Sequence, residues 1–304
     1  MPPYKQIAKE VVERTLVAPG KKISLRKHFD PGWTPAWYSK RRAAGMLARG
    51  TEELTDLQAK LYAQDVYGLL IVLQALDAAG KDGTIKHVMS GLNPQGCRVT
   101  SFKQPSAVEL DHDYMWRCIR ALPPRGHIGI FNRSYYEEVL VVRVHPEFLE
   151  KQKLPPEARR KDIWDQRFQQ INCFEKYLYE NGFHVLKFFL HISKEEQKRR
   201  FLERIDTPEK HWKFSQSDVE ERAYFDDYLD AYEDCLRNTS TKWAPWHVIP
   251  ADNKPFARLA VSLLICNKLC SLDLAYPKVT EEQRRKLAEA RWLLENEQTG
   301  RKGK

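Results

Sequence analysis

Short, continuously apolar runs alternate with longer amphipathic stretches through the middle of the chain. The first run, at residues 68–74, reads Gly-Leu-Leu-Ile-Val-Leu-Gln, which is typical of a strand covered on both faces. Similar runs follow at 98–102, 127–132, 184–192 and 247–250. Helical stretches are predicted between and beside them, at 83–90, 106–121, 161–180, 194–205, 218–238 and 253–274. This alternation predicts an α/β fold, a three-layer sandwich with a parallel sheet between helices.

The two ends of the chain differ from this middle part. Residues 1–50 are rich in Pro, Gly, Lys and Arg and lack a sustained period, so we expect an extended N-terminal arm. Thr51 predicts the start of a helix, because two glutamates follow it and suit the positive end of a helix. Residues 281–304 are largely charged and predict a solvated helix with a frayed end. One domain is therefore expected at 51–280, between an arm and a tail.

The composition adds an excess of positive charge. The chain has 50 Lys and Arg against 41 Asp and Glu, a formal net charge of +9 at pH 7. Such an excess favours an anionic partner, such as nucleic acid, an acidic membrane or a polyphosphorylated molecule, and it suits simple solubility equally well. The sequence has no apolar run long enough for a bilayer, no signal-peptide pattern and no zinc-type cysteine spacing. We therefore expect a cytoplasmic protein with reduced thiols and no membrane partner.

A glycine-containing loop follows the first predicted strand and opens a helix. Residues 75–83 read Ala-Leu-Asp-Ala-Ala-Gly-Lys-Asp-Gly. In a P-loop, backbone amides at a helix N-terminus surround phosphate oxygens, and a lysine reaches the outer phosphates. Gly80 and Lys81 match that pattern, whereas Ala75 replaces its first glycine and Asp82 replaces its hydroxyl residue. The position between strand and helix favours a phosphate site, and the alternative is a structural turn capped by aspartates.

The departures from the P-loop pattern indicate a metal. Asp77 and Asp82 put two carboxylates into a loop meant for anions, and they would repel phosphate unless divalent cations lay between them. Such hard oxygen ligands suit Mg²⁺. The residues expected to contact phosphate in this loop are Ala78, Ala79, Gly80, Asp82, Gly83 and Thr84.

Polar residues also end the neighbouring strands. The run at 127–132 ends in Asn132 and Arg133, and ligands of open α/β sheets lie beyond the carboxyl ends of strands. Arg133 has the fork geometry that binds phosphate, and Asn132 can offer its amide oxygen. Glu137 follows closely enough to supply the missing carboxylate, and Lys103, after the preceding strand, points to the same edge. On its own the Asn-Arg-Ser segment also fits a polar structural turn.

The segment after the fourth strand is basic. Arg200 and Arg204 are four residues apart, so they share one face of a helix. A proline then ends this helix, and we expect a mobile basic lid at about 206–217, with Lys210 and Lys213 near phosphate. Phosphoryl transfer needs positive charge around the migrating group, which a closing lid supplies. A solvated helix face of mixed charge is the alternative.

Together these segments resemble the second family of polyphosphate kinases, in collinear order over about residues 20–277. The matching motifs are the loop itself, Ser-Phe-Lys-Gln-Pro at 101–105, Phe-Asn-Arg-Ser-Tyr-Tyr-Glu-Glu-Val-Leu at 131–140 and Pro-Glu-Lys-His-Trp-Lys-Phe at 208–214. The resemblance implies a thymidylate-kinase-like fold and reversible phosphoryl transfer between inorganic polyphosphate and adenine or guanine nucleotides. It further implies Mg²⁺, with Mn²⁺ as a substitute, a homo-oligomer (dimer or tetramer) and no nucleic-acid partner.

The resemblance also assigns roles to single residues. It implies a catalytic set of Asp77, Lys81, Arg133, Glu137, Arg200 and Arg204, with Asp77, Asp82 and Glu137 as metal ligands. Members that act mainly on nucleoside diphosphates often carry Asp where this chain has Asn132. The motif here is similar to the subgroup that accepts both AMP and ADP, and the change makes Glu137 a candidate substitute ligand.

The expected mechanism is direct in-line transfer without a phosphoenzyme. The attacking phosphate oxygen is already anionic, so no general base is required. Two alternatives stay open: an ATP-dependent nucleoside or nucleotide kinase, and a basic nucleic-acid-binding protein with a vestigial P-loop. The sequence lacks the dense alternation of aromatic and basic residues that would favour the second.

Overall fold

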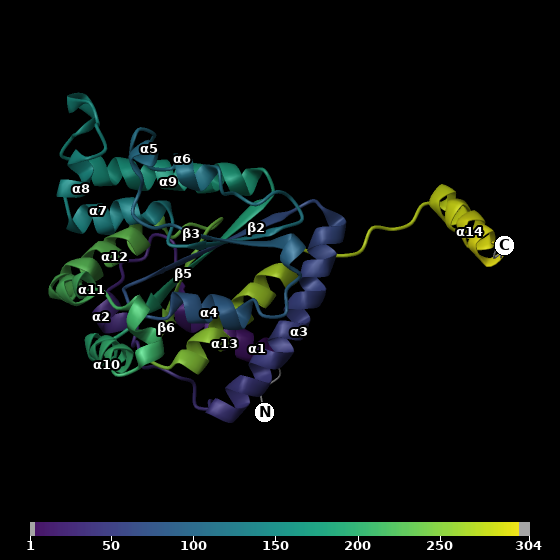
Figure 1. The fold of residues 1–304 in the computed structure, drawn as a ribbon, viewed down its shortest axis with the longest axis horizontal. Helices are drawn as coiled ribbons and strands as arrows, with labels where there is room; N and C mark the ends of the chain where they lie inside the picture. The colour runs from purple at the N-terminus through teal and green to yellow at the C-terminus, as the bar shows by residue number, and fades with distance from the viewer. Residues whose placement is uncertain (1–3, 298–304) are drawn as a thin grey trace, which may run out of the picture.

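A six-stranded sheet lies between two layers of helices in the computed structural model, which describes residues 4–297 (Figure 1). The strand order is β1-β6-β5-β2-β4-β3, with all pairs parallel except that of β1 with β6. The strands are β1 (Leu16–Val17), β2 (Gly68–Ala75), β3 (Cys97–Ser101), β4 (Ile128–Asn132), β5 (Phe183–His191) and β6 (Trp246–Pro250). The five apolar runs predicted as strands are therefore confirmed, and the α/β sandwich with them.

The helices divide between the two faces of the sheet (Figure 1). One layer holds α5 (Ala107–Leu110), α6 (Trp116–Ile119), α7 (Val141–Val144), α8 (Glu147–Glu150), α9 (Ile163–Glu180) and α12 (Phe225–Thr239). The other holds α1 (Tyr4–Thr15), α3 (Lys40–Gln64), α4 (Lys81–Val88) and α13 (Lys254–Cys270). The remaining helices are α2 (Leu25–His28), α10 (Lys194–Ile205), α11 (Gln216–Glu220) and α14 (Glu281–Glu295). Short 3₁₀ turns are η1 (Pro94–Gly96), η2 (Tyr135–Val139), η3 (Pro156–Ala158), η4 (Pro208–Lys213) and η5 (Glu221–Tyr224).

The central strand β2 explains where the ligand edge of the sheet lies. All eight of its residues are buried, because β4 and β5 pair on its two sides and helices cover both faces. Its carboxyl end lies beside the carboxyl ends of β4 and β5. Loops that leave these strands therefore meet at one edge, as open parallel sheets require.

Two expectations for the N-terminal part were wrong. Residues 4–15 form α1, and α3 begins at Lys40 with Ser39 as N-cap, so Thr51 lies inside a helix. The Ser39 side chain accepts from the Arg42 amide, and a buried stripe that includes Ala43 and Met46 packs on α13. Basic and glycine residues between these apolar positions hide the stripe in the sequence. Thr51 instead donates to the Leu47 carbonyl within the helix.

Two predicted helices are interrupted. The stretch at 106–121 forms α5 and α6, separated by a turn in which the Asp113 carboxylate accepts from the Met115 amide. Aspartate competes with the helix for backbone donors in this way. The stretch at 218–238 begins as α11 and η5 before α12 starts at Phe225.

The C-terminal part of the chain stands away from the body (Figure 1). Residues 281–295 form α14, and every residue of it is exposed, which confirms the predicted solvated helix. The last residues of the predicted tail, 298–304, lie outside the described residues, and the predicted frayed end falls there. Within residues 4–297, the helices are all too short or too polar to cross a membrane.

Candidate active site

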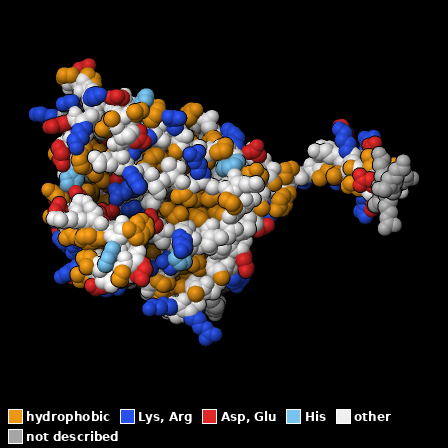
Figure 2. Space-filling view, in the orientation of Figure 1, with side chains coloured by type: hydrophobic (Ala, Val, Ile, Leu, Met, Phe, Trp, Pro, Cys, Tyr) orange, Lys and Arg blue, Asp and Glu red, His pale blue; other side chains and the backbone are white. Residues whose placement is uncertain are grey.

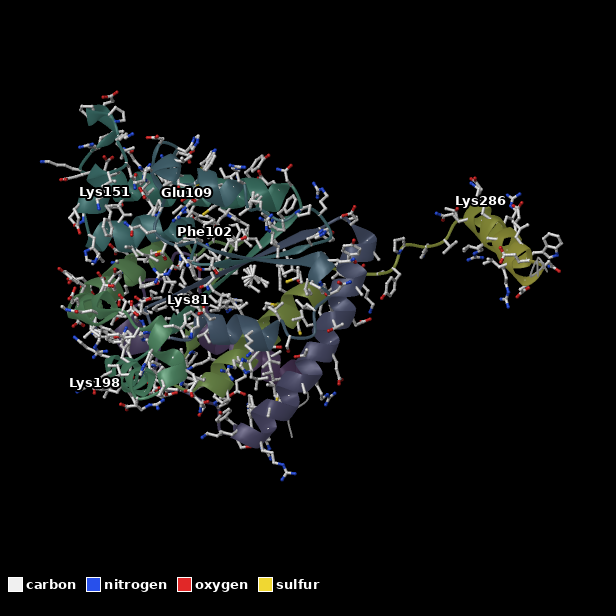
Figure 3. The ribbon with its side chains drawn as sticks, in the orientation of Figure 1. Lys81, Phe102, Glu109, Lys151, Lys198 and Lys286 are labelled. Carbon is white, nitrogen blue, oxygen red and sulfur yellow. The ribbon has the colours of Figure 1, made fainter. Side chains whose placement is uncertain are left out.

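A cavity of about 710 Å³ opens at the carboxyl ends of β2, β3 and β4. The loop at 77–83 forms its floor, and α10, η4 and the start of α13 supply most of its charged walls. Lys and Arg side chains gather on the visible face where the two helical layers meet (Figure 2). Figure 3 shows Lys81 and Phe102 between the layers, with Glu109 and Lys151 in the layer of α5 to α9. The cavity therefore lies where the sequence predicted a phosphate site.

The loop after β2 lines the cavity and contains two residues with a left-handed backbone. Ala78 and Gly80 have positive φ angles of 61° and 107°. A left-handed conformation costs a residue with a Cβ about 1–2 kcal/mol, so Ala78 has to be held there by its surroundings. The α4 helix starts at Lys81, and its N-terminus faces the cavity with the positive end of the helix dipole. This arrangement suits an anion.

Arg200 holds this loop from behind. Its side chain is buried, with 3% exposed. Its five N–H groups donate to the Glu196 carboxylate and to the carbonyl oxygens of Ala78, Ala79, Ala251 and Asp252. We expected a lid arginine that reaches phosphate, but the donors of Arg200 are all engaged with the protein. The residue joins the loop to the end of β6 and compensates the strain at Ala78.

Lys81 lies at the start of α4 and reaches back over the loop. Its ammonium group donates to the Ala75 carbonyl over 2.8 Å. Burial, followed by the charge of Arg133, lowers the pKa of Lys81 to about 8. A bound polyanion would favour the charged form, so Lys81 gains positive character when the cavity fills.

Arg133 lies between two carboxylates at the end of β4. Its Nη2 lies 2.7 Å from Asp77 Oδ1, and its Nη1 lies 2.9 Å from Glu137 Oε2. Arg133 has a φ of 65°, and its amide donates to the Leu73 carbonyl of β2. The charge of Glu137, more than that of Asp77, raises the pKa of Arg133, so the guanidinium stays charged. About a third of the Arg133 side chain is exposed, and it lines the cavity.

The candidate metal ligands fit a cation that is shared with phosphate. Asp77 and Asp82 line the cavity, and Asp82 Oδ1 accepts from the Asn132 amide over 2.8 Å. Glu137 lines the adjoining pocket and contacts Arg133, so the three predicted ligands are not brought together. Across residues 4–297, His, Cys, Asp and Glu form no group of three or more that could hold a metal ion. Two carboxylates suffice for Mg²⁺ when substrate phosphates and water complete its shell.

The predicted lid residues lie along one wall of the cavity. Arg204 pairs with Asp218 over 3.0 Å, and Lys210 pairs with Glu203 over 2.8 Å. The predicted break is confirmed, since α10 ends at Ile205 and a proline opens η4. Burial, followed by the charge of Asp77, raises the pKa of Asp218. The side chain of Lys213 lies outside the described part of the chain.

Two cations of the cavity were missed in the sequence. Lys254 and Arg258 lie one turn apart at the start of α13 and line the cavity. Burial, followed by the charge of Arg200, lowers the pKa of both groups. The sequence contained a signal for both residues. They lie at the start of the helix that follows the fifth predicted strand, and the predicted parallel strands end at the same edge of the sheet. Lys103, which was predicted, lines both the cavity and the pocket beside it.

A second pocket of about 430 Å³ adjoins the cavity and shares Phe102, Lys103 and Arg133 with it. Its wall combines aromatic and aliphatic side chains with a few polar groups: Tyr114, Val141, Phe148, Glu109, Glu138 and Gln152. Such a lining binds a flat or apolar ligand group and orients it by a few hydrogen bonds. The two hollows together suit a molecule with a ring at one end and phosphate at the other.

Comparison with known proteins agrees with this geometry. Residues 38–275 match the family model of polyphosphate kinase 2. The chain is 51% identical over 279 residues to an ADP-polyphosphate phosphotransferase of Rhodopseudomonas palustris, covering 91% of this chain and 96% of the relative. It is 46% identical over 253 residues to an AMP/ADP-polyphosphate phosphotransferase of Meiothermus ruber, covering 83% and 91%. A crystal structure of polyphosphate kinase 2 from Arthrobacter aurescens TC1 superimposes with a TM-score of 0.82 at 40% identity, covering 92% of this chain and 96% of that one.

Proposed function

This chain belongs to the polyphosphate kinase 2 family, and from that premise we propose that it transfers phosphoryl groups from inorganic polyphosphate to nucleoside diphosphates and monophosphates. The observation that carries the proposal is the pair of adjoining hollows. A cationic cavity over a P-loop meets a pocket with aromatic walls, and Arg133 borders both. The cavity suits polyphosphate, and the pocket suits a nucleoside whose phosphate reaches Arg133.

We propose a direct in-line reaction. An oxygen of the nucleotide's terminal phosphate attacks the terminal phosphorus of polyphosphate, and the bridging P–O bond breaks. The nucleotide gains one phosphoryl group, and the polyphosphate leaves one unit shorter. The attacking oxygen is already anionic, so no side chain has to accept a proton. The reverse reaction uses the same site.

The residues of this chain act by position and charge. Lys81 and the amides of the loop hold the polyphosphate end, and Arg133 neutralises charge that develops between donor and acceptor. Arg204 and Lys210 close one wall and exclude water, while Lys254 and Arg258 extend the cationic wall along α13. Lys103 serves the nucleotide phosphate, since it borders both hollows.

A divalent metal is expected in a phosphotransferase of this kind, and we propose Mg²⁺, with Mn²⁺ as a substitute. Asp77 and Asp82 would hold it, because their carboxylates lie at the cavity and supply hard oxygen ligands. When bound, it supplies neutralisation of the phosphate oxygens that the carboxylates would otherwise repel.

The names of two relatives, together with Asn132, support a proposal for the nucleotide range. One relative is named for ADP and the other for both AMP and ADP. We propose that this chain accepts both, and the guanine nucleotides as well. A cytoplasmic location and a dimer or tetramer complete the proposal.

One assay tests the proposal. Polyphosphate is incubated with AMP, ADP, GMP or GDP, with Mg²⁺ or with EDTA, and the nucleotide products are separated by ion-exchange chromatography. We expect ATP from ADP, both ADP and ATP from AMP, matching guanine products, and no turnover in EDTA. Turnover with ATP and a nucleoside, but none with polyphosphate, would favour an ATP-dependent kinase instead. Salt-dependent binding of DNA or RNA without any turnover would favour the nucleic-acid alternative.

A further inference from the structure

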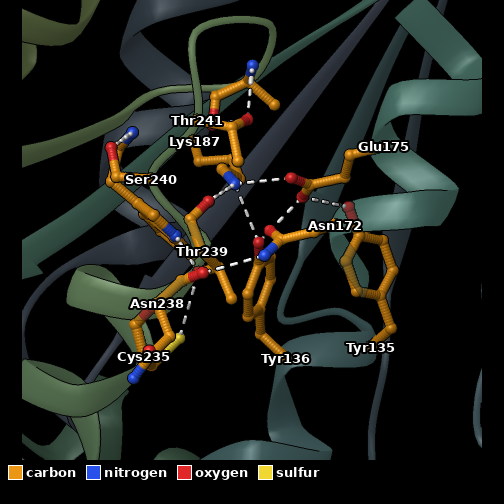
Figure 4. Close-up of polar contacts among 12 residues, drawn as sticks. Tyr135, Tyr136, Asn172, Glu175, Lys187, Cys235, Asn238, Thr239, Ser240 and Thr241 are labelled. Atoms are coloured by element: carbon orange, nitrogen blue, oxygen red, sulfur yellow. Dashed lines mark hydrogen bonds and ion pairs between the residues drawn. The ribbon is translucent and has the colours of Figure 1, made fainter. Parts of the chain in front are cut away.

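Lys187 of β5 and Glu175 of α9 form an ion pair inside the protein (Figure 4). Both side chains are completely buried, and Lys187 Nζ lies 2.6 Å from Glu175 Oε2. The ammonium group also donates to Tyr136 Oη and to the Thr239 carbonyl, each over 2.8 Å. The three N–H groups of Lys187 are therefore all used, and none is directed to a ligand.

Two consecutive tyrosines complete this network. Tyr135 Oη and Tyr136 Oη both donate to Glu175 Oε1, over 2.9 and 2.8 Å. Burial, followed by the charge of Glu175, raises the pKa of both phenols, so both stay protonated and keep donating. The ion pair thus fixes two of the buried side chains of η2, those of Tyr135 and Tyr136.

Stability alone is a weak reason for such a pair. Removing two charges from water costs free energy, and well-packed apolar side chains of similar volume often stabilise a protein equally well. The network nevertheless satisfies its polar groups and joins four segments: η2, α9, β5 and the end of α12. The network fixes one arrangement of these segments. Its role is therefore to be sought in η2 and the residues next to it, which it holds in place.

That segment is the one that carries Arg133 and Glu137. Arg133 has a left-handed backbone, which for a residue with a Cβ persists only when its surroundings hold it. On the β2 side it is held by the Leu73 carbonyl and by the bond from Gln74 to Ser134. On the other side the chain continues directly into Tyr135 and Tyr136, and Glu137 follows them to contact Arg133.

We propose that the buried Lys187–Glu175 pair is a positioning device for Arg133. By holding Tyr135 and Tyr136, it fixes the backbone from which Arg133 reaches the border of the two hollows. Loss of the network then misplaces the guanidinium and slows phosphoryl transfer, while the substrates still bind through the loop and the cationic walls. These residues contact no substrate, so they are positioning residues and not catalytic ones.

The first test removes one hydroxyl group. In Tyr136→Phe the ring stays and the bonds to Glu175 and Lys187 are lost, so we expect kcat to fall roughly 10- to 100-fold with KM for nucleotide and polyphosphate nearly unchanged. The matched control is Thr15→Val, which removes a buried hydroxyl bonded to His247 at the amino end of β6. We expect Tm to fall in both variants, whereas kcat should fall only in Tyr136→Phe. Equal, unchanged kcat in both would overturn the proposal.

The second test keeps the fold while changing the network. The double variant Glu175→Leu with Lys187→Met leaves no buried charge without a partner, and the tyrosines lose their acceptor. We expect it to fold with a low kcat, whereas Glu175→Gln with Lys187→Met, which keeps an amide acceptor for both phenols, recovers most of the kcat. Full activity in the Leu/Met variant would overturn the proposal.

The third test asks whether the effect passes through Arg133. In a double-mutant cycle, Tyr136→Phe is expected to lower kcat much less in an Arg133→Lys background than in the natural chain. Additive losses would contradict the proposal.

The inference rests on the proposed function, because its readout is phosphoryl transfer. An inactive natural chain in the same assay overturns both. An active natural chain with a normal Tyr136→Phe variant overturns the inference alone.

Discussion

The guanidinium of Arg133 lies 2.7 Å from the carboxylate of Asp77. Each group thus balances the charge of the other. A phosphate can bind Arg133 in place of Asp77, and a divalent metal can bind Asp77 in place of Arg133. The pair therefore offers a contact to each of these ligands.

Arg133→Lys is expected to lower kcat about 10²- to 10³-fold, because lysine cannot make the forked contacts that a guanidinium makes with phosphate and two carboxylates. Steady-state kinetics with ADP and polyphosphate measure the loss. The control is Arg26→Lys, in an exposed pair with Asp230 on another surface, which should leave kcat within about twofold. A comparable kcat for the two variants would contradict the assignment of Arg133.

Lys81→Met is expected to lower kcat on the order of 10²-fold or more, since it removes a positive group from the phosphate loop. Lys86→Met, on the same helix but exposed, is the matched control. Near-normal turnover of Lys81→Met would contradict a phosphate role for the lysine.

The lowered pKa of Lys81 also predicts two opposite responses to pH. The charged form binds phosphate, so kcat/KM should fall as pH rises through about 8. Stability should move the other way: between pH 8 and the ordinary value of 10.5, the unfolded chain binds more protons than the folded one, and unfolding becomes harder as pH rises. The contribution of Lys81 is the free energy of unfolding of the natural chain minus that of Lys81→Met, both measured with denaturant. A difference that falls as pH rises would refute the prediction.

Asn132→Asp should make the protein more dependent on metal. The amide of Asn132 donates to Asp82, and the substitution replaces this bond by two facing carboxylates. In EDTA, we expect the free energy of unfolding to fall by about 1 kcal/mol relative to the natural chain. Mg²⁺ should then raise the Tm of the variant more than it raises the Tm of the natural chain. The same Mg²⁺ response in both proteins would argue against a cation beside Asp82.

Arg200→Lys should disturb the fold of the loop as well as its activity. A lysine can replace only part of the contacts to Glu196 and four carbonyl groups, so the free energy of unfolding should fall by about 2–4 kcal/mol, with a loss of kcat. Arg199→Lys, next to it but largely exposed, should be nearly neutral. Loss of kcat with no change in stability would instead indicate direct contact with phosphate.

Arg258→Ala should weaken polyphosphate binding more than nucleotide binding, because Arg258 lines the cavity and not the adjoining pocket. We expect a rise of roughly 3- to 10-fold in KM for polyphosphate, equivalent to about 1 kcal/mol, which shrinks at high salt. Lys268→Ala, at the other end of α13, removes the same charge away from the cavity and should leave this KM unchanged. Equal effects on both KM values would oppose the assignment.

The strands of the sheet and the edge that carries the site could be predicted because their signals are local. A short, continuous apolar run such as 68–74 fits few structures other than a buried strand. The glycine-containing loop that follows it precedes a helix, and this places Gly80 and Lys81 between the strand and the helix. The start of α3 was missed because its apolar stripe is interrupted and becomes readable only when α13 packs on it.

The roles of single side chains were harder to predict, because they depend on pairs far apart in sequence. Arg200 looked like a mobile cation from its spacing, but its acceptors come from Ala78 and Ala251, which the helix pattern cannot indicate. Glu137 was expected at a metal, and its position four residues after Arg133 instead brings the two together. Lys187 stood in an apolar run and gave no sign of Glu175, its partner on α9.

The contacts of Arg200 have a consequence for the order of folding during translation. The proposed phosphate loop, at 75–83, is made early, but Arg200, which holds it, comes much later. Two of the carbonyl groups that hold this arginine belong to Ala251 and Asp252. Arg200 can complete its set of acceptors only after the segment that follows β6 has left the ribosome. The nascent chain therefore contains the proposed phosphate loop long before the full set of contacts that holds it can form.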